Sequence, residues 1–210
     1  MSPPPHPVLL MASQVTPDGS DPATYRGLPS IFEYINWDGD QRRFNCGQAA
    51  ACTILARYHL LTTDADLAQD AMIGIEATDP PDNFGGWFGT SRQCVERICT
   101  TRGLPIEEVG GEEELRQRLA DRRPVMVVLG TEGKALFAGL HAPAGHWMVA
   151  YGYDDYQIFL TNYLTPGMPW DEFRMRWNSF VPRLISMRRV GLGAATLIAI
   201  EDVPPAPVIV

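Results

Sequence analysis

The sequence predicts an α+β fold in which helices pack on an antiparallel sheet. Apolar residues recur with a helical period up to about residue 120, and short apolar runs typical of strands follow from residue 125. Two of these runs are joined by a hairpin turn rather than by a crossover helix, which favours antiparallel pairing. At 210 residues the chain is long enough to bury a core as one domain.

Four helices are expected before the strands. They are expected to begin at Asn45, near Thr63-Asp64, at Thr90-Ser91 and near Glu112, and the fourth ends before Pro124. Apolar residues three or four positions apart would face the core in each helix. The expected inward residues are Ala51, Ile54, Leu55 and Tyr58; Leu67, Ala71 and Met72; Val95, Ile98 and Cys99; and Leu115 and Leu119.

The second half of the chain is expected to supply the sheet. The expected strands are Val125–Leu129, His146–Tyr151, Gln157–Thr161, Leu184–Val190 and Ala195–Glu201. The continuous apolar run of the first is typical of a strand that is buried on both faces. A turn at residues 152–155 joins the second and third strands, and a short amphipathic helix follows at residues 170–178.

The composition of the two ends predicts three regions. Residues 1–30 are rich in Pro, Ser, Asp and Gly and are expected to form a flexible arm, residues 31–202 the domain, and residues 203–210 a Pro-rich tail. The start of the chain has no basic segment, and its apolar run at residues 8–12 is too short for a signal peptide or a membrane span. We therefore expect a cytoplasmic protein, with non-classical export as the alternative. Whether the arm is a pro-segment, a linker or an export address stays open.

The net charge of −8 limits the possible partners. Lysine occurs only at Lys134 and the arginines are scattered, so the chain has no basic cluster that could follow a phosphate backbone. We expect no nucleic-acid partner, and the sequence leaves the oligomeric state open.

The four cysteines do not form a disulfide or zinc pattern. None is spaced C-x-x-C, and we expect free thiols. A zinc site that combined cysteines with His141 or His146 is the metal alternative. It is disfavoured because Cys46 and Cys52 would point to different faces of one helix. We expect neither a metal nor another cofactor.

Cys46 is the candidate nucleophile. At the start of a helix its sulfur would face unpaired backbone N–H groups and the positive end of the helix dipole, and both favour a thiolate. Gly47 would leave room for a substrate backbone to approach. The competing interpretation is that Cys46 is a small buried apolar residue, as we expect for Cys52, Cys94 and Cys99.

His146 is the candidate base, at the start of an apolar strand. Asn162 ends the hairpin partner strand, where its side-chain carbonyl could accept a hydrogen bond from one ring nitrogen and direct the other toward sulfur. Asp154 and Asp155 are rival orienting residues, although they suit a turn better. His141, in a Gly/Pro/Ala loop, is the competing base.

A donor for the oxyanion of an acyl-transfer intermediate is also required. Gln41 precedes Cys46 on the approach loop, and its side-chain amide could converge with the backbone N–H of Cys46. Gln48 is the alternative, unless it is only a polar surface residue of the first helical turn.

These segments together resemble the C39-like branch of the papain-like cysteine peptidases. The resemblance spans roughly residues 31–180. It is carried, in order, by Asn45-Cys46-Gly47-Gln48-Ala49-Ala50, Gly89-Thr90-Ser91, Glu114-Leu115-Arg116 through Arg123-Pro124-Val125, Gly145-His146-Trp147-Met148-Val149-Ala150-Tyr151-Gly152-Tyr153-Asp154-Asp155, and Trp170-Asp171-Glu172-Phe173 through Trp177.

The resemblance implies a papain-like fold with the nucleophile helix packed on the sheet. It implies Cys46 as nucleophile and His146 as general base and acid. It further implies Asn162 as the orienting residue and Gln41 as the oxyanion donor. We therefore expect an amide-bond hydrolase that acts on a peptide or protein through an acyl-enzyme. An acyltransferase, a deamidase, or a catalytically silent peptide-binding module with the same cleft are the alternatives.

Overall fold

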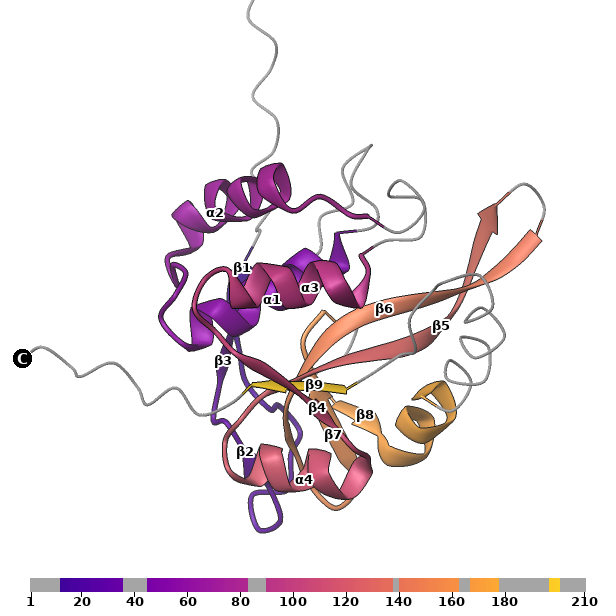
Figure 1. Ribbon diagram of the computed structural model, residues 1–210. Helices are drawn as coiled ribbons and strands as arrows, with labels where there is room; N and C mark the ends of the chain where they lie inside the picture. Colours follow the sequence, from indigo (N-terminus) through magenta and orange to yellow (C-terminus); the bar gives the residue numbers. More distant parts are fainter. Residues whose placement is uncertain are drawn as a thin grey trace, which may run out of the picture.

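Helices pack against both faces of an antiparallel sheet (Figure 1). The computed structural model describes residues 12–35, 45–82, 90–137, 140–162, 167–177 and 197–200. The helices are α1 (Cys46–Arg57), α2 (Ala65–Thr78), α3 (Arg92–Thr100) and α4 (Glu112–Ala120), and residues 170–177 are also helical. The strands are β1 (Ala12–Val15), β2 (Arg26–Gly27), β3 (Ile31–Tyr34), β4 (Ile106–Val109), β5 (Val125–Phe137), β6 (Leu140–Tyr153), β7 (Gln157–Leu160), β8 (Gly167–Pro169) and β9 (Leu197–Ile200). The predicted α+β class is confirmed.

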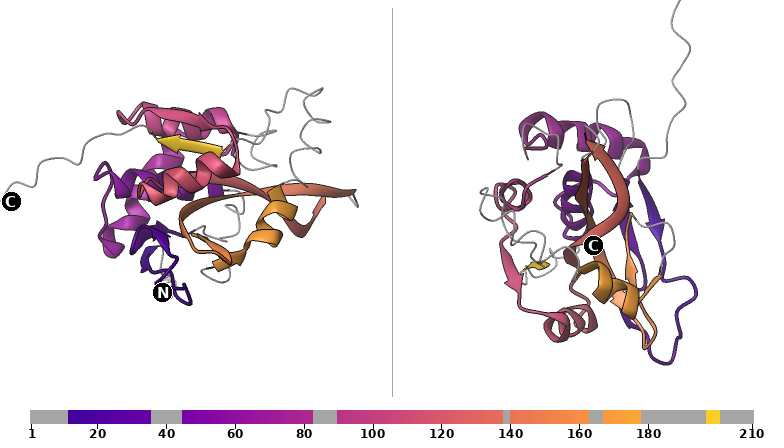
Figure 2. Two further views of the ribbon diagram at one scale, coloured as in Figure 1. Left: turned by 90° about the horizontal axis from the view of Figure 1, so that it is seen from below. Right: turned by 90° about the vertical axis from the view of Figure 1, so that its right-hand side faces the viewer.

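The main sheet has the strand order β4-β9-β5-β6-β7-β8, and β2 pairs with β6 beside this path. All of these pairings are antiparallel. β5 and β6 form a long hairpin that extends beyond the body of the protein (Figures 1 and 2). β6 starts at Leu140 rather than at His146, so the expected strand start was wrong. Residues 142–145 are Gly, Pro and Ala, which are uncommon in strands, so the sequence does not indicate that β6 includes them. Pairing with β5 holds this segment in the strand.

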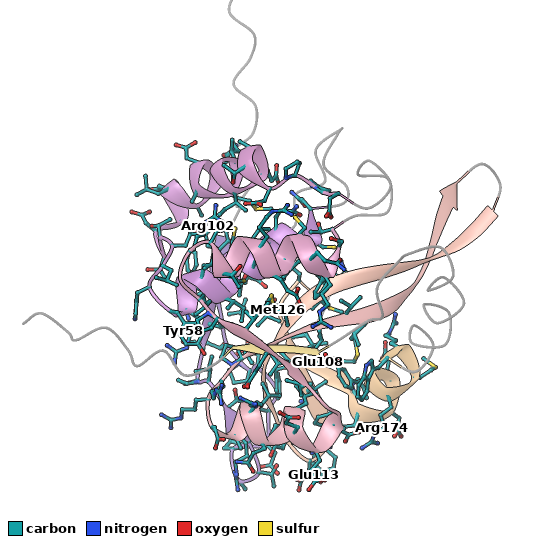
Figure 3. All side chains as sticks on the ribbon, viewed as in Figure 1. Tyr58, Arg102, Glu108, Glu113, Met126 and Arg174 are labelled. Atoms are coloured by element: carbon teal, nitrogen blue, oxygen red, sulfur yellow. The ribbon has the colours of Figure 1, made fainter. Side chains whose placement is uncertain are left out.

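The sheet separates two apolar layers. Side chains alternate along β5 and β6, so that one set packs with α1, α2 and α3 and the other with α4 and the helix at residues 170–177. The first set includes Met126, Val128, Trp147, Val149 and Tyr151, and the second includes Val125, Val127, Leu129, Met148 and Ala150. Met126 lies in the interior, whereas Glu113 and Arg174 lie at the periphery (Figure 3).

α1 is buried along almost its whole length, because it packs against β3 and β6 and also against α2 and α3. The prediction that one face of this helix, with Ala51, Ile54, Leu55 and Tyr58, points inward therefore underestimates its burial. In α2 the buried residues are Ala68, Met72 and Ile75. The expectation for Leu67 was wrong, since this side chain is 54% exposed. The inward residues predicted for α3 and α4 are confirmed.

The N-terminal segment packs more closely than the expected flexible arm. β1 pairs with β3, β2 pairs with β6, and the Asp21 N–H donates to the Asp154 carboxylate at 3.0 Å. The structure thus places residues 12–30 against the domain, because backbone pairing compensates for their polar composition. Residues 1–11, the tail at residues 203–210 and the expected strand at residues 184–190 lie outside the described residues. Across the described ranges, each helix is too short or too polar to traverse a bilayer.

Candidate active site

Cys46 begins the buried helix α1, as predicted. The Asn45 carbonyl accepts the Ala49 N–H at 2.9 Å and so starts the helical hydrogen bonding. The side chain of Asn45 does not cap the helix. Its amide nitrogen instead donates to Glu76 Oε1 of α2 at 2.6 Å. The residue before the sulfur is therefore anchored to a neighbouring helix.

His146 and Cys46 are brought together across 100 residues of sequence. The imidazole hydrogen-bonds the sulfur, and the N–H of Trp147 donates to Cys46 Sγ at 3.5 Å. Burial alone would raise the pKa of Cys46. The hydrogen bond and charge of His146, together with the backbone N–H groups of Trp147 and Gly47, outweigh burial and hold this pKa below its usual value. The surroundings of the sulfur favour a thiolate.

The other three cysteines differ from Cys46 in this respect. All four thiols are free, as predicted. Burial raises the pKa of Cys94 and of Cys99 to about 12, and it also raises that of Cys52. Within the described ranges no three His, Cys, Asp or Glu side chains converge as a metal site would require. Cys46 is the cysteine whose environment favours the anion.

Asn162 contacts His146, but through a different oxygen from the predicted one. The main-chain carbonyl oxygen of Asn162 lies 3.1 Å from His146 Nε2, while the side-chain amide nitrogen donates to the Tyr34 carbonyl at 2.9 Å. A carbonyl can only accept, so this hydrogen bond requires the ring proton on Nε2. The contact therefore selects the tautomer that leaves Nδ1 for the sulfur.

Asn162 adopts a left-handed backbone conformation with φ of 55°. Asparagine tolerates this region better than most residues, and a glycine or asparagine is favoured there. Its N–H donates to Glu33 Oε2 of β3 at 3.0 Å. Glu33 was not among the predicted site residues. The available signal was a lone carboxylate within the apolar run Ile31-Phe32-Glu33-Tyr34.

Gly47 makes room for Thr90 rather than for a substrate. A Cβ at Gly47 would lie 2.4 Å from Thr90 Cβ, so the two elements are in tight contact. The carbonyl of Thr90 accepts the indole N–H of Trp147 at 2.9 Å. Residue 90 thus links the first turn of α1 to β6 beside the sulfur, and the interpretation of Gly47 as a substrate approach was wrong.

Replacing Gly47 by Ala is expected to destabilise the protein by about 1–3 kcal/mol, because the new methyl group overlaps a buried, hydrogen-bonded side chain. Urea denaturation would measure the change. Gly74→Ala in α2 is the matched control, since a Cβ at Gly74 meets nothing within 4 Å. It should stabilise the helix by about 0.5–1 kcal/mol. Equal effects of the two substitutions would contradict this description of Gly47.

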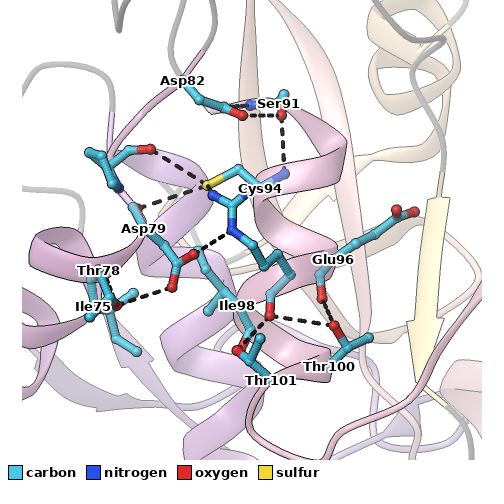
Figure 4. A network of polar contacts seen from close by, with 12 residues as sticks. Ile75, Thr78, Asp79, Asp82, Ser91, Cys94, Glu96, Ile98, Thr100 and Thr101 are labelled. Atoms are coloured by element: carbon cyan, nitrogen blue, oxygen red, sulfur yellow. Dashed lines mark hydrogen bonds and ion pairs between the residues drawn. The ribbon is translucent and has the colours of Figure 1, made fainter.

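Gln48, the alternative oxyanion donor, is fully buried, which rules out the competing interpretation that it is only a polar surface residue. Its amide nitrogen donates to the Asp79 carbonyl at 2.9 Å, and its oxygen accepts from Thr90 Oγ1 at 2.6 Å. Asp79 belongs to a polar network that joins the end of α2 to α3 through Arg97 and Cys94 (Figure 4). Gln48 therefore connects α1 to this network. Gln41, the first candidate oxyanion donor, lies outside the described residues.

The rival orienting and basic residues are located elsewhere. Asp154 is buried and accepts the N–H groups of Asp21, Tyr156 and Gln157, so it holds the turn after β6 as expected. Asp155 is exposed in the same turn. His141 lies within β6 opposite Leu136, not in a loop. It lies five strand positions from His146, a distance of roughly 17 Å.

Comparison with solved structures identifies a related fold. The chain resembles the peptidase domain of Streptococcus ComA, a bifunctional ABC transporter involved in a quorum-sensing pathway, with a TM-score of 0.51 and 13% identity over 80% of this chain and 96% of that domain. The two share a fold. A candidate C39-like peptidase from Bacillus anthracis has a TM-score of 0.49 and 12% identity over 78% of this chain and 90% of its own. No protein-family model and no curated protein matches the sequence.

At 13% identity the likeness to the ComA peptidase domain concerns the fold alone. That fold is the one predicted from the sequence, with the helix that begins at Cys46 packed on an antiparallel sheet. The assignment of chemical roles must therefore come from the side chains themselves.

Proposed function

We propose that the chain is a cysteine peptidase-like amide-bond hydrolase that acts on a peptide or protein. Cys46 is the nucleophile, His146 the general base and acid, and Asn162 the residue that orients His146. The observation that carries this proposal is the hydrogen bond of His146 to a sulfur at the start of a buried helix, with the pKa of that sulfur lowered. A cysteine thiolate paired with an imidazolium is a nucleophile suited to carbonyl carbon.

The first chemical step forms the acyl-enzyme. The Cys46 thiolate attacks the carbonyl carbon of the scissile amide, and the C=O electron pair moves to oxygen as a tetrahedral intermediate forms. The N–H of Cys46 lies in the first turn of α1, where backbone donors have no partner within the helix, and is a donor suited to this oxyanion. Protonated His146 then gives its proton to the leaving amine as the C–N bond breaks.

The second step releases the acyl group. Neutral His146 takes a proton from water, the resulting hydroxide equivalent attacks the thioester carbon, and the C–S bond breaks to return the thiolate and imidazolium. Throughout both steps Nε2 keeps its proton toward the Asn162 carbonyl, while Nδ1 exchanges a proton with sulfur, amine and water. One tautomer therefore serves the whole cycle.

The direct test is mass spectrometry of the protein incubated with a peptide library near pH 7. The expected result is cleaved peptides together with an acyl adduct that maps to Cys46. Intact peptides with unmodified Cys46 across a library that the protein binds would contradict the proposal and would indicate a silent peptide-binding module instead.

The same experiment distinguishes hydrolysis from acyl transfer and from deamidation. The acyl-enzyme can also pass its acyl group to an amine, and a glutamine side-chain amide can replace the backbone amide as substrate. Methylamine added to the reaction would give amide conjugates in the case of a transferase. Conversion of Gln to Glu without chain cleavage would indicate a deamidase.

A further inference from the structure

Glu33 lies one hydrogen bond away from the residue that orients His146. Its Oε2 accepts the Asn162 N–H at 3.0 Å, and the Asn162 carbonyl in turn lies 3.1 Å from His146 Nε2. Glu33 and Asn162 are 129 positions apart in the sequence, so the contact exists only in the folded protein. The Glu33 carboxylate thus holds the N–H of Asn162, and the carbonyl of the same residue contacts the imidazole.

The strand that carries Glu33 is itself attached to the nucleophile helix. The N–H of Tyr34 donates to Thr53 Oγ1 of α1 at 2.9 Å, and its hydroxyl donates to the Thr62 carbonyl at 2.8 Å. Tyr34 is fully buried, and its carbonyl accepts the Asn162 side-chain amide at 2.9 Å. Residues 33 and 34 therefore fix the position of Asn162 relative to α1.

The backbone of Asn162 needs such support. A residue with φ of 55° at the end of a strand occupies a sparsely populated region and stays there only when its surroundings hold it. Rotation about this residue would swing its carbonyl away from His146 Nε2. Two hydrogen bonds, from its N–H to Glu33 and from its side chain to Tyr34, resist that rotation.

We propose that Glu33 is a positioning residue of the active site, which fixes Asn162 so that the Asn162 carbonyl selects the His146 tautomer that pairs with Cys46. This inference rests on the proposed function. Glu33 acts through its hydrogen bond as an acceptor. It is not a catalytic residue, because its contacts are with Asn162 and with Ser13 Oγ at 3.5 Å.

The environment of Glu33 is unusual for a carboxylate whose only role is to interact with solvent. Burial raises its pKa, although hydrogen bonds from Asn162 and Ser13 oppose this effect. A partly buried carboxylate is expected to form at least one hydrogen bond, since an unpaired buried charge is costly in free energy. The Asn162 N–H is that partner.

The test compares three substitutions by the rate at which iodoacetamide alkylates Cys46 at pH 6. Glu33→Ala removes the acceptor and is expected to slow alkylation by about tenfold, because a misplaced imidazolium stabilises the thiolate less. Glu33→Gln keeps an acceptor oxygen and is expected to stay within about threefold of the unsubstituted protein. Glu33→Asp withdraws the carboxylate by one methylene and should fall between the two.

The control is Glu112→Ala, which removes another partly buried carboxylate, bonded to Arg174 of the helix at residues 170–177 at 2.8 Å. It is expected to leave alkylation of Cys46 unchanged. If Glu33→Ala fails to fold, Glu33→Asp decides: slower alkylation supports the proposal and the unsubstituted rate overturns it. Equal rates for folded Glu33→Ala and the unsubstituted protein also overturn it.

A second measurement is independent of catalysis. Nitrogen NMR of the His146 ring is expected to show the Nε2–H tautomer in a Cys46→Ser background and a mixture of tautomers when Glu33→Ala is added. The same tautomer in both proteins would overturn the role of Glu33. Failure of the proposed function is recognised separately, as absence of acyl adducts and of selective alkylation in the unsubstituted protein.

Discussion

Replacing Cys46 by Ser is expected to lower peptide turnover by roughly 10⁴-fold or more and to abolish acyl-enzyme formation. Serine has nearly the same shape, but its hydroxyl stays protonated in surroundings that stabilise a thiolate, so the nucleophile is lost. The fold should persist, with a change in unfolding free energy of less than about 2 kcal/mol. Turnover of a responsive peptide and the mass of the trapped protein are the measurements.

Cys99→Ala is the matched control for this substitution. Cys99 is also fully buried and free, but burial raises the pKa of its thiol to about 12, so it has no thiolate to contribute. Its replacement is expected to preserve turnover in the folded protein. Turnover that survives Cys46→Ser would show that another group performs the chemistry.

Replacing His146 by Ala is expected to lower turnover by roughly 10²–10⁴-fold. The substitution removes the proton donor for the leaving amine. It also removes the hydrogen bond and charge that lower the pKa of Cys46, while burial, which raises this pKa, remains. The pKa of Cys46 therefore rises, and the thiolate fraction at pH 7 falls. Turnover as a function of pH and thiolate absorbance near 240 nm would measure the two effects.

His59→Asn provides the control for loss of an imidazole. His59 is exposed and follows the opposite end of α1, a helix length of about 18 Å from Cys46. Its φ of 59° is one that asparagine accepts. This variant should keep the pH dependence of the unsubstituted protein. An equal loss of turnover in both histidine variants would contradict the specific role of His146.

Many of the elements around Cys46 and His146 could be predicted because their signals are local. A capping serine and an apolar period define α3, an apolar period alone defines α4, and the Asn45-Cys46-Gly47 segment marks the start of α1. The short apolar runs of β5 and β7 are equally local signals. The proximity of Cys46 and His146 then follows from packing one helix on one sheet.

The supporting contacts could not be predicted, because they depend on backbone geometry and on distant pairing. The Asn162 carbonyl faces His146 only because Asn162 has a left-handed conformation, and residue type does not determine which of its oxygens is presented. Glu33 contributes through β3, a short strand without a motif. Glutamine is usually found at surface positions, so the sequence does not indicate that Gln48 is buried. Its burial results from the polar network between α2 and α3 that covers it.

The pH dependence of Cys46 alkylation by iodoacetamide, with the modified residue mapped by mass spectrometry, distinguishes a thiolate held by His146 from an ordinary thiol. An ordinary thiol with a pKa of about 8.5 loses roughly 100-fold in rate between pH 8 and pH 6, because its thiolate fraction falls. For Cys46 we expect a loss of less than about tenfold, with Cys52, Cys94 and Cys99 unmodified in the folded protein. A hundredfold loss at Cys46, as for an ordinary thiol, would contradict a thiolate paired with His146.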